Sequence, residues 1–124
     1  MRTFKDTRGK AWFDIVPEME NYQIDLTTNY PDIVRAFHHH NHKTEWFFAA
    51  SGEFKLVLTN PLETIYMSQG DVVRIDPGRW HGYQCLGLQP AIMLEVSSAK
   101  YDLEDPDDQK CPWNTHDGWE VERK

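Results

Sequence analysis

The chain has 124 residues, which is enough for one hydrophobic core and too short for two ordinary domains. Its formal net charge of −7 and sequence pI near 5.2 argue against nucleic acid or an anionic membrane as the main partner, because such surfaces attract basic proteins. The first residues contain no apolar run typical of a signal peptide, and no later segment is long enough to cross a bilayer, so we expect a cytoplasmic location. The two cysteines, Cys85 and Cys111, are too few for a disulfide scaffold.

Short segments of apolar or alternating residues follow one another along the chain, separated by turn-forming residues. They predict strands over residues 11–16, 20–28, 33–40, 45–51, 54–59, 62–67, 72–76, 81–86 and 91–97. No amphipathic helix pattern lies between them. Eight or nine strands spaced about ten residues apart predict an all-β fold, an antiparallel sandwich or barrel.

The last part of the chain has a different composition. From Tyr101 it is acidic, and the simplest interpretation of this stretch is a solvated connector. Trp113 and Trp119 follow it, and two large aromatic side chains are unfavourable on a free tail. We therefore expect one domain over residues 1–124, with a barrel core over about 11–97 and residues 101–124 packed back on it.

Four of the six histidines lie within residues 38–42, directly before an aromatic segment. Each imidazole needs hydrogen-bond partners and changes its charge near neutral pH, so this density indicates a site. Side chains alternate along a strand, which puts His38 and His40 on one face and His39 on the other. His39 and His42 are expected to be exposed strand and turn residues.

Two groups of residues in and after this stretch resemble the two cupin motifs. In the first motif a pair of histidines one residue apart precedes a glutamate and a glycine, matched here by His38, His40, Glu45 and Gly52. In the second a glycine precedes Pro-x-Gly and a histidine, matched by Gly70, Gly78 and His81, with Asp76 in the place of the proline. The resemblance implies a single cupin domain, that is, an antiparallel β-barrel or jelly roll.

In cupins that carry both motifs, three histidines and the glutamate bind one divalent metal inside the barrel. The resemblance implies a metal at His38, His40, Glu45 and His81, and these donors suit Zn, Fe, Mn, Ni or Cu alike. An inward carboxylate at Glu45 needs such a cation or a protonated histidine beside it. The same residues could instead form a hydrogen-bonded polar network or a metal-free catalytic dyad. No organic cofactor is expected.

A narrower resemblance covers most of the chain. It joins the chain to the dTDP-4-dehydrorhamnose 3,5-epimerase group and its relatives, the nucleotide-sugar 3,4-ketoisomerases, through Asp6–Gly9, Arg35–His38, Pro77–Tyr83, Tyr101–Pro106 and Pro112–Asn114. The resemblance makes His38 the base that removes a proton beside a keto carbon. Arg35 matches a phosphate or sugar contact and Arg8 a nucleotide contact, while His40 agrees with the ketoisomerases. In such chemistry a positive group stabilises the enolate oxygen and an acid returns the proton.

The chain also departs from this group at three positions. The lysine that would stabilise the enolate falls at Glu45, the tyrosine acid at Glu95, and the carboxylate that might orient the base at Thr115. A metal could replace the lysine as a Lewis acid, but it would occupy His38. His38 cannot be a ligand and a base at the same time.

Other residues are candidates for catalysis or substrate binding. Tyr83 shares a face with His81 and is a candidate acid, or ordinary barrel filling. Glu95 is assigned to the site or to an exposed rim. Arg79 and Trp46 are candidate substrate contacts. The arginines could instead be surface charges, and the Trp46 segment could be core on one face and a pocket wall or subunit interface on the other.

Three functions follow from these observations. The resemblance over the whole chain favours an isomerase or epimerase of a nucleotide-linked keto-sugar. The metal motif favours a metal-dependent cupin, either a dioxygenase or a metal-assisted isomerase, acting on a small carbonyl or carboxylate compound. The missing lysine and tyrosine favour a non-catalytic sugar-binding protein. In each case we expect a small-molecule ligand, no nucleic acid or membrane partner, and a homodimer.

Overall fold

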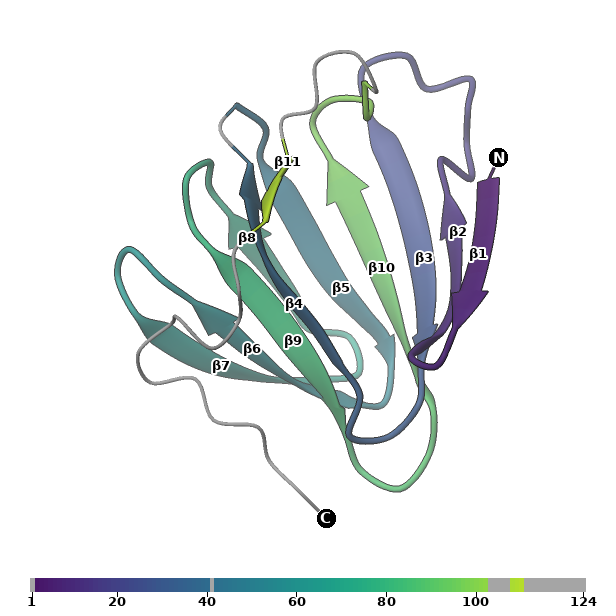
Figure 1. The fold of residues 1–124 in the computed structure, drawn as a ribbon, viewed down its shortest axis with the longest axis vertical. Helices are drawn as coiled ribbons and strands as arrows, with labels where there is room; N and C mark the ends of the chain where they lie inside the picture. Colours follow the sequence, from purple (N-terminus) through teal and green to yellow (C-terminus); the bar gives the residue numbers. More distant parts are fainter. Residues whose placement is uncertain (1, 41, 103–107, 111–124) are drawn as a thin grey trace.

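The computed structural model describes residues 2–40, 42–102 and 108–110, without the side chains of 36–39 and 108–110 (Figure 1). Within this part the chain forms eleven strands and no helix, as the sequence predicts. The strands are β1 (Arg2–Asp6), β2 (Gly9–Phe13), β3 (Gln23–Asn29), β4 (Val34–His40), β5 (Glu45–Ser51), β6 (Glu53–Leu58), β7 (Glu63–Ser68), β8 (Val72–Ile75), β9 (His81–Leu86), β10 (Ala91–Ser97) and β11 (Asp108–Lys110). The described residues contain no helix that could span a bilayer.

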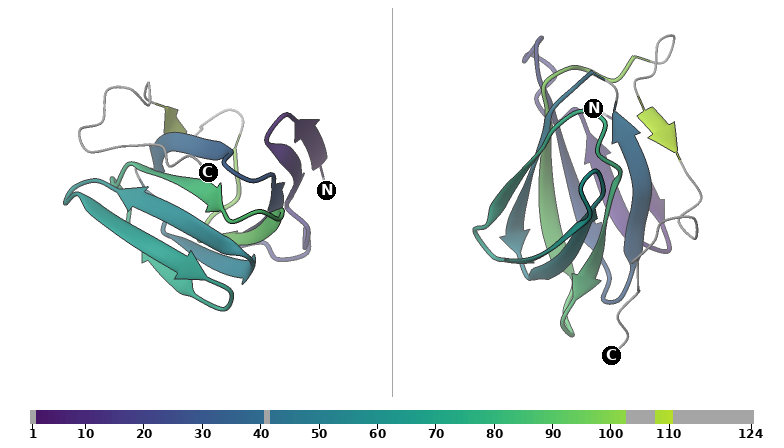
Figure 2. Two further views of the ribbon diagram at one scale, coloured as in Figure 1. Left: turned by 90° about the horizontal axis from the view of Figure 1, so that it is seen from below. Right: turned by 90° about the vertical axis from the view of Figure 1, so that its left-hand side faces the viewer.

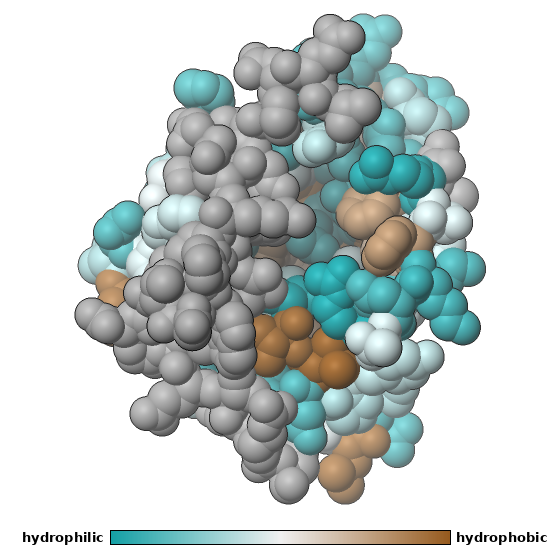
Figure 3. All heavy atoms as spheres, in the orientation of Figure 1, coloured by the Kyte–Doolittle hydropathy of each residue, from teal (hydrophilic) through white to brown (hydrophobic). Residues whose placement is uncertain are grey.

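The strands form two antiparallel sheets that face each other (Figure 2). One sheet has the order β1-β2-β3-β10-β5-β8 and the other the order β11-β4-β9-β6-β7. On the face shown in Figure 3, the coloured surface is mostly hydrophilic and its apolar residues lie in small groups. The antiparallel all-β barrel predicted from the sequence is therefore confirmed.

The apolar core lies between the sheets. It is built from the inward positions of β5, β6, β9 and β10 and from single residues of β7 and β8, and its largest members are Phe47, Phe54, Leu56, Leu58, Met67, Ile75 and Met93. Each such side chain contributes about 1.5–3 kcal/mol when it is fully buried. Cys85 is also fully buried and behaves as a small apolar residue.

The inward positions become polar toward one end of the barrel. Phe47 belongs to the core, whereas Glu45 begins the same strand. Because β10 runs antiparallel to β5, its last residue, Ser97, lies opposite Glu45. His40 at the end of β4 and His81 at the start of β9 lie at this same end. The ends of β4 and β10 and the starts of β5 and β9 therefore meet at one end of the barrel, and polar groups from both sheets lie together above the apolar core.

Strand β4 contains an irregularity that simple alternation does not predict. Arg35 lies opposite Tyr83 of β9, and His38 lies opposite His81, so β4 has one more residue than β9 between the two pairs. A bulge of this kind changes which residues share a face. Positions 35 and 38 therefore both oppose inward-facing residues of β9, although they are an odd number of residues apart.

The ends of the domain extend beyond the predicted core. Strand β1 pairs with β2 in a hairpin that the sequence analysis did not predict, because four of its five residues are exposed and show no apolar alternation. Residues 103–107 and 111–124, where the C-terminal segment is expected to pack back, lie outside the described residues. Strand β11, which belongs to that segment, pairs with β4.

Candidate functional site

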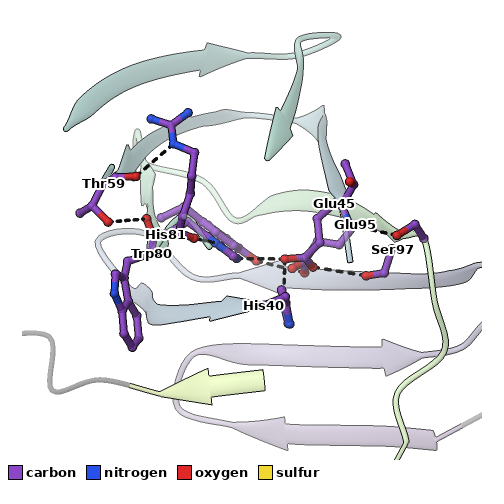
Figure 4. A network of polar contacts seen from close by, with 11 residues as sticks. His40, Glu45, Thr59, Trp80, His81, Glu95 and Ser97 are labelled. Atoms are coloured by element: carbon purple, nitrogen blue, oxygen red, sulfur yellow. Dashed lines mark hydrogen bonds and ion pairs between the residues drawn. The ribbon is translucent and has the colours of Figure 1, made fainter. Parts of the chain in front are cut away.

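Three buried side chains from three strands converge at the polar end of the barrel (Figure 4). His40 Nε2 lies 2.8 Å from Glu45 Oε1, and His81 Nε2 lies 3.0 Å from the same oxygen. The three residues are only 6%, 5% and 2% exposed. Each offers one potential metal-ligand atom, and these atoms all lie within 4.8 Å of one another.

Backbone hydrogen bonds hold these three residues in place. The Gly78 N–H donates to the His40 carbonyl at 2.7 Å, which fixes the loop before His81 against the end of β4. Thr44 is tied to Ser98 twice, because the Ser98 N–H donates to the Thr44 carbonyl and the Thr44 N–H donates to Ser98 Oγ, both at 2.9 Å. The start of β5, and with it Glu45, is thereby fixed beside the end of β10.

Glu45 carries a negative charge inside the barrel. Burial alone would raise its pKa, but the hydrogen bonds and charges of His40 and His81 outweigh burial and hold the pKa well below its usual range. The Nδ1 atom of His81 lies 2.9 Å from the Arg79 carbonyl, which only accepts hydrogen bonds, so Nδ1 carries a proton. Nε2 is then the nitrogen that offers a lone pair when the ring is neutral, an arrangement common among metal-binding histidines.

The chemistry of this set suits a divalent metal ion. Two imidazole nitrogens and one carboxylate oxygen are ordinary ligands of first-row divalent metals. The two histidine nitrogens lie 2.8 and 3.0 Å from the carboxylate oxygen, and all three atoms lie within 4.8 Å of one another. The same contacts also form a hydrogen-bonded network when the rings carry protons. His38, the fourth expected ligand, lies opposite His81 in the backbone pairing, and its side chain is outside the described part.

A cavity of about 300 Å³ lies beside these residues. It is lined by Arg2, Phe13, Gln23, Asp25, His40, Lys43, Glu45, Glu95, Ser97 and Tyr101. Three carboxyl groups line it, and Arg2 and the buried Lys43 supply positive charge. The cavity gives a small polar ligand access to the histidine and glutamate set.

Two of the carboxyl groups have raised pKa values. Burial raises the pKa of Glu95 to about 8, the negative charges of Glu45 and Asp25 add to this effect, and Arg35 and Tyr83 oppose it. Burial also raises the pKa of Asp25, which accepts hydrogen bonds from the Asp14 N–H and the Gln23 side chain. A carboxyl with a pKa near 8 is present in both protonation states near neutral pH, as a proton-transfer group requires.

Tyr83 lies behind Glu95 and is not among the residues that line the cavity. Its hydroxyl donates to Glu95 Oε2 at 3.4 Å and lies 2.9 Å from Thr27 Oγ1. Its ring packs edge-on against Phe47 and Phe54, with ring centres 5.7 and 5.5 Å away. Burial raises the pKa of Tyr83 well above its usual value. Tyr83 is therefore part of the core and a hydrogen-bond partner of the cavity-facing acid.

The structure does not bring the four expected substrate contacts to this cavity. Arg8 binds Asp6 in the turn between β1 and β2, at 2.8 and 2.5 Å. Arg79 donates to the carbonyls of Thr59 and Pro61 at 3.0 and 2.7 Å, and so holds the connection between β6 and β7.

Arg35 and Trp46 also point elsewhere. Arg35 Nε donates to Asn29 Oδ1 at 2.5 Å, between the sheets. Trp46 lies on the face of β5 opposite to Glu45, since neighbouring residues of a strand point to opposite sides. His42 is exposed, as expected, and the side chain of His39 lies outside the described part.

The sequence analysis missed several residues that line the cavity, among them Gln23, Asp25, Lys43 and Ser97. Gln23 and Asp25 belong to a strand in which polar and apolar residues alternate. This alternation was the signal that could have placed both residues on one face of the strand. Apolar residues usually take the inner face of such a strand. Here the polar positions point inward and Asp25 pairs with Glu95 across the sheet, so the usual assignment of faces is inverted.

Comparisons with known proteins agree with this fold. The chain is 27% identical over 114 residues to the probable low-salt glycan biosynthesis epimerase Agl13 of Haloferax volcanii, and the aligned region covers 82% of this chain and 70% of that protein. It is 26% identical over 125 residues to the spore coat polysaccharide biosynthesis protein SpsL of Bacillus subtilis, with 88% and 82% covered.

Solved structures share the fold over a smaller part of their length. The capsular polysaccharide assembling protein CapF from Staphylococcus aureus matches with a TM-score of 0.80 at 23% identity, and the oxalate decarboxylase of Lactobacillus farciminis with a TM-score of 0.76 at 23% identity. Each match covers 88% of this chain but 33% of the solved chain, so this chain spans about a third of their length. The family model described as the cupin domain matches residues 31–97, more than half of the chain. The chain therefore belongs to the cupin family.

Proposed function

We propose that this cupin is an enzyme that epimerises or isomerises a nucleotide-linked keto-sugar by moving a proton beside the keto group. The observation that carries this proposal is the pairing of Glu95, a carboxyl with a pKa near 8, with the His40, Glu45 and His81 set around one cavity. The names of the two curated relatives, a probable glycan epimerase and a polysaccharide biosynthesis protein, support a sugar substrate.

The site residues have separate roles in this reaction. Loss of a proton from the carbon beside the carbonyl leaves its electron pair on the carbonyl oxygen as an enolate. Glu95 faces the cavity, and its carboxylate takes this proton. In isomerisation the protonated Glu95 returns a proton to the neighbouring carbon, whereas epimerisation takes the returning proton from a second donor on the opposite face of the same carbon. Lys43 lines the same cavity and supplies the positive charge that the family's lysine would give at position 45.

His40, Glu45 and His81 would hold the divalent metal. Ser97 Oγ donates to Glu45 Oε2 at 3.3 Å and orients the carboxylate, so that Oε1 faces both imidazoles. A bound divalent ion supplies Lewis acidity that polarises a carbonyl group. The role of His38, as ligand or base, stays a prediction.

The test uses solvent deuterium. The protein is incubated with a dTDP-4-keto-6-deoxy sugar in D₂O, and the sugar is followed by NMR. We expect deuterium at a carbon beside the keto group with the wild-type protein and little with Glu95→Gln. Arg74→Met, a change in a surface ion pair with Asp76, is the matched control and should retain the exchange. A wild-type protein that leaves the sugar free of deuterium would count against the proposal.

The His40, Glu45 and His81 set also supports a second function, a metal-dependent cupin that acts on a small carbonyl or carboxylate compound. This function predicts turnover or oxygen consumption with such compounds by metal-loaded protein, and no deuterium in the keto-sugar. Turnover of either kind that is lost on Glu45→Ala argues against a sugar-binding protein without activity.

A further inference from the structure

Five side chains form a hydrogen-bonded chain between the two sheets, behind the wall of the cavity. Arg35 Nε donates to Asn29 Oδ1 at 2.5 Å, and Asn29 Nδ2 donates to Thr27 Oγ1 at 3.0 Å. Thr27 Oγ1 lies 2.9 Å from the Tyr83 hydroxyl, which donates to Glu95 Oε2 at 3.4 Å. The three middle residues are buried, and of the five only Glu95 lines the cavity.

The bonds of this chain all run in one direction. A guanidinium can only donate, so Asn29 must turn its oxygen to Arg35 and its amide nitrogen to Thr27. The same amide nitrogen lies 3.3 Å from the Ala91 carbonyl, which also requires a donor. Thr27 accepts from Asn29 and directs its own proton to the Tyr83 oxygen, and Tyr83 directs its proton to Glu95. Each bond polarises the next one, as in other aligned chains.

We propose that Arg35 is a positioning residue, which acts on Glu95 through this chain by fixing the direction of its hydrogen bonds. The Tyr83 O–H then always points to Glu95 Oε2 and favours the carboxylate form. The inference rests on the proposed function, in which Glu95 moves the proton. It gives Arg35 a different role from the phosphate or sugar contact that the family resemblance implies.

The surroundings of Glu95 agree with this role. Asp25 on β3 and Glu45 on β5 disfavour its negative charge, whereas Arg35 on β4 and Tyr83 on β9 favour it. Arg35 is not among the residues that line the cavity, and its second contact, from Nη2 to the Thr28 carbonyl at 3.2 Å, also lies on β3. Its influence on the cavity therefore reaches the substrate through Glu95.

A double-mutant cycle tests the proposal with the deuterium-exchange reaction. Thr27→Val removes the hydroxyl in the middle of the chain and keeps the shape of the side chain, and Arg35→Met removes the guanidinium. We expect each change to lower kcat by about tenfold or more with KM within about twofold, and the double variant to be no slower than the slower single variant. A rise in KM for Arg35→Met, or effects that multiply in the double variant, would show a substrate contact and overturn the proposal.

Asn29→Asp tests the direction of the bonds themselves. The carboxylate still accepts from Arg35 but cannot donate to Thr27, so the contact with Arg35 is kept, as an ion pair, while the chain loses its direction. We expect kcat to fall as it does in Thr27→Val. Arg74→Met is the control for loss of an arginine and should leave kcat and KM unchanged. Wild-type kcat in a folded Asn29→Asp protein would contradict the proposal.

A measurement without substrate separates this inference from the proposed function. The Tyr83 hydroxyl proton, buried and hydrogen-bonded, should give its own NMR signal, and we expect that signal to shift in Asn29→Asp, although Asn29 is not itself hydrogen-bonded to Tyr83 in the chain. Arg35→Met does not serve in this measurement, because Arg35 lies opposite Tyr83 on the neighbouring strand. An unchanged signal in a variant whose Tm is within about 3 °C of wild type overturns the proposal. If the keto-sugar takes up no deuterium with wild-type protein, the proposed function fails. The NMR measurement still decides whether a change at Asn29 alters the hydrogen bond of the Tyr83 hydroxyl.

Discussion

Glu45 keeps its negative charge inside the barrel because the Nε2 atoms of two imidazoles lie 2.8 and 3.0 Å from one of its oxygens and Ser97 donates to the other. A buried carboxylate without such partners would take up a proton. The same oxygen is the point at which both rings converge. A change that removes its charge but keeps its shape therefore tests the metal hypothesis directly.

We predict that Glu45→Gln abolishes metal binding. Protein purified without a histidine tag should contain close to one equivalent of a divalent metal, and the variant should lose most of it, because a neutral amide is a much weaker ligand than a carboxylate. Elemental analysis measures the content. His42→Ala changes an exposed histidine of the same stretch and should retain the metal. Wild-type protein that cannot be loaded with Zn, Fe, Mn, Ni or Cu would contradict the prediction.

Glu95 should set the pH dependence of deuterium exchange. As the base that removes the proton it must be ionised, so the rate should rise as the pH rises through about 8. Glu95→Gln should lower the rate by about 10²–10⁴-fold. Tyr83→Phe removes a hydrogen bond that lowers the pKa of Glu95, so the rising limb should move to higher pH. A limb that stays in place in Tyr83→Phe would show that another group controls it.

Among the elements, those with apolar inner faces were predicted well. The sequence predicts 45–51, 81–86 and 91–97 as strands, and β5, β9 and β10 have these bounds. Strand β1 was missed because a mostly exposed edge strand has no apolar alternation. The inward residues of β3 were not predicted for a different reason. Its polar residues point inward to form the site, so the rule that apolar residues face the interior fails there.

The candidate site was predictable only in part for similar reasons. The motif spacing singles out His40, Glu45 and His81, which the structure brings together. Arg8 and Arg35 were inferred from a family whose residues need not keep their contacts here, and Arg79 and Trp46 from charge and from an aromatic segment. All four lie away from the cavity described. Whether Arg35 reaches the interior depends on the β4 bulge, which no periodic pattern shows.

The turn between β5 and β6 offers a test at the scale of elements. Gly52 has a φ of +79°, and an added Cβ would lie 2.4 Å from the Ala91 Cβ on β10. Gly52→Ala should therefore lower the free energy of unfolding by roughly 2–4 kcal/mol, from the left-handed backbone and from overpacking together. Gly87→Ala, at a φ of +83° with open space around it, should cost only about 1 kcal/mol. Urea unfolding measures both, and equal losses would show that the contact with Ala91 is unimportant.

For the molecule as a whole, the two sheets place a polar cavity above an apolar core, and the balance of charge there contributes to stability. The histidines stabilise the anion of Glu45, while Glu95 and Asp25 are destabilised as anions by burial. The proposed reaction needs the carboxylate form of Glu95, whereas the stability of the fold favours its protonated form. The expected homodimer, the cytoplasmic location and the absence of an organic cofactor stay predictions.

This balance predicts how stability changes with pH in metal-free protein. Between about pH 4.5 and 8 folded Glu95 retains a proton that the unfolded chain has released, so the free energy of unfolding should fall as the pH rises through this window. Glu45 acts oppositely: its folded pKa is lowered, so its contribution is complete above about pH 4.5 and is lost as the pH falls toward its folded pKa.

Comparison with Glu95→Gln isolates the first effect, because glutamine is neutral in both states. Urea unfolding at pH 5 and pH 8 should show a decline in the wild-type protein that exceeds that of the variant by an amount on the order of a few kcal/mol, with Asp25 accounting for part of the remaining decline. At pH 8 the variant should be the more stable protein, since it no longer keeps an ionisable carboxyl in an acidic, buried setting. Parallel declines would mean that Glu95 titrates near its ordinary value, and its role as the proton-transfer group would then lose its main support.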